Sequence, residues 1–389
     1  MTATFYRMHT DQTRESIALE NLFAGPALSS CWLIGGGPSL NALPSDAIRE
    51  SPVPKMCINL SGTKLMRPTF WTSYDPSARF HRSVYLDSGV MKFMHRRRAM
   101  DLVPETTFKV CDCPNTFFFE RDGDRGFSDF LSPEHRKIVD WADSMVQAID
   151  ILYRLGFRIL YLAGCEMRMR PSKSQIARAA ELGIHYDPQE RFNDFLKRCH
   201  EAGLTTNELD QLESGQHYHF DESKPIQAAA NTDSHYFRIA QYLRLSRRSM
   251  SLAGMQLVSV TPHSRLNDYF PYVPAQKVLR TIDRKIGNPQ QEPVRGLYRQ
   301  TEPRHLRMLG PMQDFKPHHW TPEKHLNPPR TRHQEPIQQP EQDGELLVEE
   351  EGFEQLPRQN DRNGDVLANR LLCKLDRFPM DDHNPDEEG

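Results

Sequence analysis

The stretch Ser144–Ala163, SMVQAIDILYRLGFRILYLA, joins a helical pattern to a strand pattern with almost no linker. In its first half, apolar residues recur at intervals of three and four, which is typical of an amphipathic helix. They are Met145, Ala148, Ile149, Leu152 and Leu155. Gly156 ends this pattern, and the apolar run Ile159–Ala163 follows directly. A helix, a short turn and a buried strand make up half of a βαβ unit.

Other short apolar runs are predicted as strands of the same kind. They are Cys31–Ile34, Lys55–Asn59, Phe70–Tyr74, Phe108–Val110 and Leu257–Val260. A second long helix is predicted over Ala228–Arg248, and Gly254 ends the helical region before the last of these strands. Because the runs are apolar throughout and do not alternate, they indicate a parallel sheet that is covered on both faces. We therefore expect an α/β fold with a doubly wound, mostly parallel sheet and helices on both faces.

Charge and proline divide the 389-residue chain into unlike parts. Residues 286–389 carry 13 Lys and Arg against 20 Asp and Glu, whereas residues 1–285 carry 36 against 32. The same C-terminal segment holds 13 of the 29 prolines. We expect an N-terminal extension over residues 1–25, one folded domain over residues 26–285, and a largely disordered acidic tail over residues 286–389. A short helix at Val366–Leu375 would allow the tail to bind a protein partner.

Several classes of protein are not expected. No run of 18 apolar residues is present, which argues against a transmembrane helix, and the N-terminus lacks the pattern of a signal peptide. We interpret the seven cysteines as reduced thiols in the cytoplasm. Cys111 and Cys113 lack a second Cys or His pair at zinc spacing, so no metal site is predicted. The basic stretch His95–Arg98 lacks an aromatic platform, so nucleic acid is not an expected partner.

The loop Gly35-Gly36-Gly37-Pro38-Ser39 follows the predicted strand Cys31–Ile34. Glycines allow backbone amides to approach a ligand closely, and Pro38 suits the first position of a helix. Amides at a helix N-terminus bind anions, so the loop is a candidate phosphate site. The alternative is a tight strand-to-helix turn with no ligand.

Polar residues follow three other predicted strands. Asn59 and Ser61 come after one strand, Asp75 after the next, and Glu166 after Ile159–Ala163. The carboxyl ends of parallel strands border the crevice in which open α/β sheets bind ligands. Asn59 can form hydrogen bonds with a base or ribose, and Asp75 can hold hydroxyl groups or a metal ion. Together with the glycine loop, these residues predict a nucleotide site.

The order of these motifs resembles two related families. The GGGPSL loop, Asn59, the helix from Ser144 and the strand that leads to Glu166 resemble the bacterial family-42 sialyltransferases. They equally resemble the family that includes the archaeal 6-hydroxymethylpterin pyrophosphokinase. Three more segments resemble the sialyltransferases alone: Tyr218–Asp221, Asn231–Asp233 and Val260–Leu266. Both families have a Rossmann-like fold, so the resemblance implies that fold for residues 26–285.

The resemblance also implies roles for individual residues. Ser144 would contact the nucleotide, and Tyr218 would contact the departing phosphate. Three positions depart from the sialyltransferase pattern: Ala228 stands where the general-base histidine is expected, Arg168 stands at a phosphate-binding tyrosine, and Glu166 replaces an aspartate. An alanine cannot accept a proton, so His217, His219 or His235 would have to serve as the base. Arg168 can grip phosphate oxygens in place of the tyrosine.

These observations lead to three functional hypotheses. The first is a nucleotide-dependent transferase, specifically a glycosyltransferase that uses a nucleotide-activated sugar. The second is a pyrophosphokinase-like enzyme that acts on ATP, with Mg²⁺ held by carboxylates such as Asp75 and Glu166. The third is a catalytically inactive module that binds a nucleotide, which Ala228 favours. The expected partner is therefore a nucleotide or nucleotide sugar, and His217, His219, Asp75 and Glu166 are the candidate catalytic residues.

Overall fold

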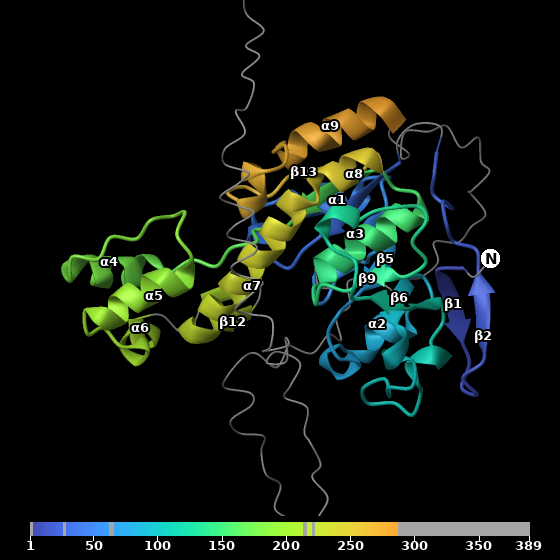
Figure 1. Ribbon diagram of the computed structural model, residues 1–389, viewed down its shortest axis with the longest axis horizontal. Coiled ribbons are helices and arrows are strands. Elements are labelled where there is room, and N and C mark those ends of the chain that lie inside the picture. The colour runs from blue at the N-terminus through green and yellow to red at the C-terminus, as the bar shows by residue number, and fades with distance from the viewer. Residues whose placement is uncertain (1–2, 26–28, 62–65, 213–215, 220–221, 287–389) are drawn as a thin grey trace, which may run out of the picture. The chain divides into compact units, whose positions relative to one another are not determined.

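Among the described residues of the computed structural model, nine strands form one sheet in the order β13-β10-β3-β4-β5-β6-β7-β1-β2 (Figure 1). The structure describes residues 3–25, 29–61, 66–212, 216–219 and 222–286. The strands of this sheet are β1 (Phe5–Met8), β2 (Arg14–Ile17), β3 (Ser30–Ile34), β4 (Lys55–Ile58), β5 (Phe70–Thr72), β6 (Met91–His95), β7 (Thr116–Phe119), β10 (Ile159–Ala163) and β13 (Gln256–Ser259). Two short pairs lie outside it: β8 (Arg121–Asp122) with β9 (Ile138–Val139), and β11 (Gln216–His219) with β12 (Glu222–Lys224).

The sheet is parallel from β13 through β7, and only the β1–β2 hairpin runs antiparallel at one edge. The chain adds β4 to β7 on one side of β3 and then returns to add β10 and β13 on the other side. The strand order therefore reverses between β3 and β10. In open parallel sheets, ligands bind at the carboxyl ends of strands next to such a reversal.

Helices cover both faces of the sheet. The described helices are α1 (Ser45–Glu50), α2 (Arg82–Leu86), α3 (Ser144–Leu155), α4 (Lys173–Glu181), α5 (Phe192–Glu201), α6 (Thr206–Leu212), α7 (Ile226–Leu245), α8 (Arg247–Leu252) and α9 (Ala275–Ile286). Successive side chains of a strand point to opposite faces. Leu33 accordingly joins one core with α3, α7 and α8, whereas Trp32 joins a second core with α1, α2 and α9.

The predicted mixed α/β class with a mostly parallel sheet is confirmed. α3 and β10 have the predicted limits, and β3, β4, β5 and β13 lie within one or two residues of theirs. The strand predicted at Phe108–Val110 is wrong, because Val110–Asp112 forms a short 3₁₀ helix. Within the segment expected as an N-terminal extension, β1 pairs with β7 and extends the sheet. The tail predictions, including the Val366–Leu375 helix, lie outside the described residues.

The single helix predicted over Ala228–Arg248 is two helices, α7 and α8. They are divided at Ser246, whose hydroxyl donates to the Tyr242 carbonyl at 2.8 Å. A serine that bonds back to the preceding turn competes with the regular backbone ladder of a helix. Gly254 follows α8 with a φ of 70°, as expected for a glycine that ends a helical segment.

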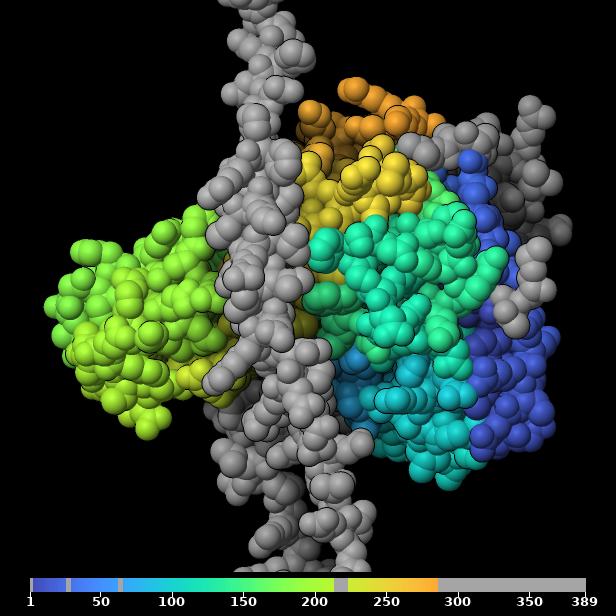
Figure 2. Space-filling view, viewed as in Figure 1, coloured from blue at the N-terminus to red at the C-terminus, as the bar shows by residue number. Residues whose placement is uncertain are grey.

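Helices α4, α5 and α6 gather around the N-terminal part of α7 and share a third hydrophobic core (Figure 1; Figure 2). Asp233 of α7 links this group to the strand ends. Its carboxylate is fully buried and accepts from the Met169 amide at 2.9 Å, the Phe192 amide at 3.0 Å and the Arg265 guanidinium at 3.1 Å. The aspartate of the Asn231–Asp233 motif therefore fixes the structure at this junction.

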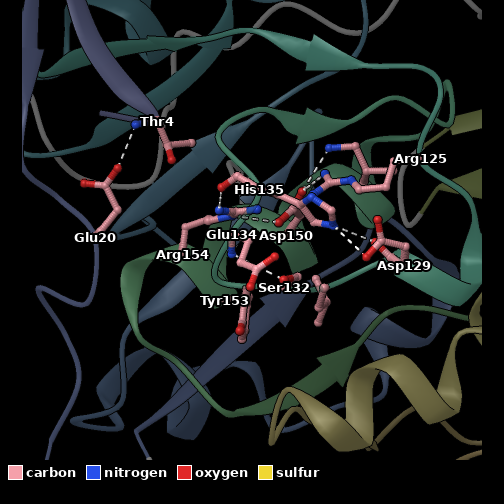
Figure 3. A network of polar contacts seen from close by, with 12 residues as sticks. Thr4, Glu20, Arg125, Asp129, Ser132, Glu134, His135, Asp150, Tyr153 and Arg154 are labelled. Atoms are coloured by element: carbon pink, nitrogen blue, oxygen red, sulfur yellow. Dashed lines mark hydrogen bonds and ion pairs between the residues drawn. The ribbon is translucent and has the colours of Figure 1, made fainter. Parts of the chain in front are cut away.

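A buried ion-pair network fastens α3 to the segments beside it (Figure 3). Asp150 is fully buried and accepts from Arg125, from Arg154 at 3.1 Å and from the Val139 amide at 2.9 Å. Arg154 also donates to the His135 carbonyl. Removing one member of such a network leaves buried charge without compensation.

We predict that Asp150→Ala lowers the free energy of unfolding by about 3–5 kcal/mol, because two buried guanidinium groups lose their counter-charge. Urea unfolding measures this change. Asp46→Ala is the control: Asp46 pairs with Arg49 on the surface, and its loss should change stability by less than about 1 kcal/mol. Equal effects of the two substitutions would contradict the prediction.

Candidate functional site

Asn59 is the centre of a polar cluster at the carboxyl ends of β4 and β5. Its Oδ1 accepts from the Ser73 hydroxyl at 2.6 Å and from the Ser144 hydroxyl at 2.8 Å. These hydroxyls in turn accept from the backbone amides of Asp75 and Tyr74. Each serine hydroxyl thus accepts from one backbone amide and donates its single proton to Asn59, which orients the side-chain amide with Oδ1 towards both serines.

This orientation leaves the Nδ2 donor of Asn59 without a partner among the described residues. The backbone of Asn59 is also held, with a φ of 52° and a carbonyl that accepts from the Trp71 indole at 2.7 Å. Asparagine adopts positive φ more readily than most residues. The structure thus brings Asn59 and Ser144 together, and it presents an amide donor at the carboxyl edge of the sheet.

The cluster continues through Tyr74 to β8. The Arg121 guanidinium lies over the Tyr74 ring at 3.7 Å, and the Tyr74 hydroxyl donates to Asp140 at 2.9 Å. Arg121 also donates to the Gln147 side chain at 2.7 Å, while Gln147 donates to Thr72 at 2.7 Å. Side chains from α3, β5 and β8 therefore form one connected network.

Positive charge accumulates beside this network. Burial, with the nearby Arg121 and Arg97 guanidinium groups, lowers the pKa of His95 to about 4. Burial also lowers the pKa of Arg121 to about 10. The 3₁₀ helix η3 (Arg96–Arg98) follows β6, and Arg96 and Arg98 pair with nearby carboxylates. Arg97 is exposed and pairs with no described carboxylate, which leaves a positive charge at this edge.

The glycine loop packs tightly against the end of β10. The Gly35 amide donates to the Ala163 carbonyl at 2.7 Å, and the Gly37 amide donates to the Gly164 carbonyl at 2.8 Å. A Cβ at Gly35 would lie 2.3 Å from the Gly164 oxygen, so glycine is required by this close approach. Two of the three glycine amides are therefore engaged by the protein itself. Pro38 begins the 3₁₀ helix η1 (Pro38–Asn41), as expected.

Glu166 lies against the same loop. Its carboxylate accepts from the Ser39 amide at 2.7 Å, and a Cβ at Gly37 would lie 1.3 Å from its Oε2 atom. The Ser39 hydroxyl is buried and has no hydrogen-bond partner among the described residues. An internal carboxylate thus takes the amide that the sequence assigned to a phosphate. The position of the Glu166 carboxylate therefore favours the alternative interpretation, in which the glycine loop is a tight strand-to-helix turn without a ligand.

Asp75 is paired with Arg79 at 2.7 Å. Lys224 of β12 lies near both and donates to the Thr232 hydroxyl at 2.9 Å. Burial, together with Arg79, lowers the pKa of Lys224 to about 7, and Asp75 opposes this shift. The Thr232 hydroxyl also donates to the Ala228 carbonyl at 2.8 Å. Lys224, with a pKa of about 7, is therefore linked through the Thr232 hydroxyl to Ala228, the position at which the sialyltransferase pattern has a histidine.

Of the three candidate histidines, the structure brings His235 to the cluster. Its Nε2 lies 3.2 Å from Asp143 Oδ2, and the other oxygen of Asp143 accepts from the first amides of α3. Ser144 is the next residue along the chain. For His217, Tyr218 and His219 the backbone of β11 is described and lies close to η1, whereas their side chains lie outside the described residues.

Two predicted residues lie apart from the cluster. Ser61 is buried and donates its hydroxyl to the Ile58 carbonyl, which closes the turn after β4. Arg168 donates to the Pro188 carbonyl at 2.8 Å and to Gln189 at 3.0 Å, and it lines a cavity after β10 and β13. None of the residues that line this cavity belongs to the Asn59 cluster.

Sequence reasoning missed Ser73, Arg121, Asp143 and Lys224. Asp143 had a recognisable signal, because an aspartate directly before an amphipathic helix is a common N-cap. Arg121 and Lys224 had none, since their partners come from distant segments. Within the described ranges no group of three or more His, Cys, Asp or Glu residues is arranged to hold a metal ion. In the same ranges no helix is long and apolar enough to cross a membrane.

Comparisons of this chain with models of known protein families, with curated proteins and with solved structures found no match.

We predict that Lys224 makes stability depend on pH. Its folded-state pKa of about 7 lies below the ordinary value of 10.5. The free-energy penalty for burying the charged ammonium is therefore fully present below pH 7. This penalty is relieved as the pH rises from 7 towards 10. Lys224→Met should therefore stabilise the protein most at or below pH 7, with a gain that shrinks at higher pH. Urea unfolding across this range measures it.

Lys197→Met is the control for Lys224→Met, because Lys197 is exposed on α5. Its effect on the free energy of unfolding should not change between pH 7 and 10. A pH-independent effect of Lys224→Met would contradict the assignment.

Proposed function

We propose that this protein is a nucleotide-dependent transferase, and specifically a glycosyltransferase that uses a nucleotide-activated sugar. The observation that carries the proposal is the Asn59 cluster, which holds an amide donor at the carboxyl ends of parallel strands beside unpaired positive charge. An oriented amide suits a base or ribose, and the guanidinium groups of Arg97 and Arg121 suit phosphate oxygens. A doubly wound, Rossmann-like fold related to the sialyltransferase families is part of the same proposal, supported by the strand order.

In this proposal the nucleoside lies against Asn59 and Ser144, and its phosphates lie towards Arg97. His235 would accept the proton of the acceptor hydroxyl. Asp143 orients the ring through Nε2, and the α3 amides hold Asp143 in turn. A carboxylate–histidine pair of this kind stabilises the imidazolium that forms on proton transfer. The guanidinium groups would stabilise the charge that develops on the departing phosphate.

A catalytically inactive nucleotide-binding module is the second candidate. The specific observation in its favour is Glu166, whose carboxylate engages the Ser39 amide and adds negative charge where the sequence predicted phosphate. Turnover separates the two candidates. An enzyme hydrolyses the nucleotide sugar that it binds or transfers the sugar to an acceptor, whereas an inactive module binds the nucleotide sugar without converting it.

Calorimetry with cytidine and uridine mono- and diphosphates and their sugar conjugates tests the proposal. We predict that Asn59→Asp weakens nucleotide binding about tenfold or more, because it keeps the Oδ1 acceptor for both serines but replaces the donor with negative charge. Asn207→Asp, on the surface of α6, should leave binding unchanged. If the wild-type protein binds none of these nucleotides, the proposed function is wrong.

We predict that Glu166→Gln leaves the binding of nucleoside diphosphates unchanged, because the proposal places the phosphates towards Arg97, whereas Glu166 follows β10 on the other side of Asn59. Glutamine retains an oxygen that can accept from the Ser39 amide. Calorimetry of uridine and uridine diphosphate, with both proteins at one salt concentration, measures the affinities. A several-fold gain for the diphosphate alone would instead place the phosphates at the glycine loop, where the Glu166 charge repels them.

A further inference from the structure

A cavity of about 360 Å³ lies beyond the carboxyl ends of β10 and β13. Its walls come from the segment after β10, the loop between α4 and α5, and the segment around the 3₁₀ helix η6 (Arg265–Asp268). The residues that matter here are Arg168, Arg170, His263, Asn267 and Asp268. The volume is within the range of pockets that bind small molecules.

Two lining residues have buried polar atoms without a hydrogen-bond partner among the described residues. Arg168 donates from one terminal nitrogen to the Pro188 carbonyl and from the other to Gln189, and its Nε donor has no described partner. Asn267 donates Nδ2 to the Thr261 carbonyl at 3.2 Å, which leaves its Oδ1 acceptor unpaired. Buried polar atoms without partners are uncommon, because their desolvation is costly.

The cavity also carries an excess of positive charge. Arg170 is exposed and pairs with no described carboxylate, and Asp268 is the acidic residue in the lining. Burial and the neighbouring Arg265 and Arg170 groups lower the pKa of Arg168, which means that the cations repel one another. Arg265 is compensated by Asp233 at 3.1 Å. An anionic group in the cavity would relieve the remaining repulsion.

We propose that this cavity binds a small oxyanion, with the anionic group at Arg168 and Arg170. Both a phosphate monoester and a carboxylate have this chemistry, and a sugar phosphate or sugar acid fits the size of the cavity. The site goes beyond the proposed function, because its ligand needs neither the Asn59 cluster nor a nucleotide.

Calorimetry of the full chain with glucose 6-phosphate, glucuronate and glucose tests the proposal, with no nucleotide present. We expect one or both charged probes to bind and glucose not to bind, and the charged probe that binds better identifies the anionic group. Arg170→Ala should weaken that binding about tenfold. Asp268→Asn should strengthen it a few-fold, because it removes a repelling charge.

Arg170 and Asp268 are both exposed, so the two variants should fold, and thermal melting checks this. Arg280→Ala on α9 is the matched control, since Arg280 is an exposed arginine outside the cavity, and it should leave binding unchanged. The proposal is overturned if neither charged probe binds at millimolar concentration, if glucose binds as well as they do, or if Arg170→Ala and Arg280→Ala have equal effects. Nucleotide binding by the same protein is measured separately, so the failure of one site leaves the other unaffected.

Discussion

The close contact between the end of β3 and the end of β10 is the constraint on which the candidate sites depend. Strand order reverses there, so this contact joins the β4–β7 side of the sheet to β13. The amides of Gly35 and Gly37 donate to carbonyls of β10 and of the residue after it, at 2.7 and 2.8 Å. The lack of a Cβ at Gly35 permits this approach, and the lack of one at Gly37 leaves room for the Glu166 carboxylate. The Asn59 cluster and the arginine-lined cavity are built from strand ends on opposite sides of this contact.

The same contact explains why a glycine-rich loop after a strand is ambiguous in function. A backbone amide that donates to a carbonyl of the protein cannot also donate fully to a phosphate. At this loop the protein itself engages the amides of Gly35, Gly37 and Ser39, the last through Glu166. Glycine is therefore explained by packing alone. Among the described residues, hydrogen-bonding capacity remains unused on the Ser39 hydroxyl of the loop, on the Nδ2 donor of Asn59 and on the Oδ1 acceptor of Asn267.

Hydrophobic periodicity along the sequence predicted the helices and strands whose burial is regular. The periodicity of Ser144–Leu155 and the apolar run of β10 predicted the correct limits, because all residues of α3 and most of those of β10 are buried. β6 was missed because its sequence, MKFMH, contains Lys92, which is fully buried and donates to the Asp87 carbonyl at 2.6 Å. The candidate site was predicted only in part. Asn59 and Ser144 lie together as expected, but the pairing of Glu166 with Ser39 joins residues 127 positions apart, which no local pattern contains.

Net charge alone gave a weak argument for an anionic ligand, because residues 1–285 carry only four more basic than acidic side chains. The pairing of those charges is more informative. Asp75 is paired with the Arg79 guanidinium, and Asp143 and Glu166 are held by backbone amides of the protein. Arg97 and Arg170 pair with no described carboxylate. The carboxyl edge of the sheet therefore presents positive charge at two separate places, and an anionic ligand is favoured there by local pairing and not by the average composition.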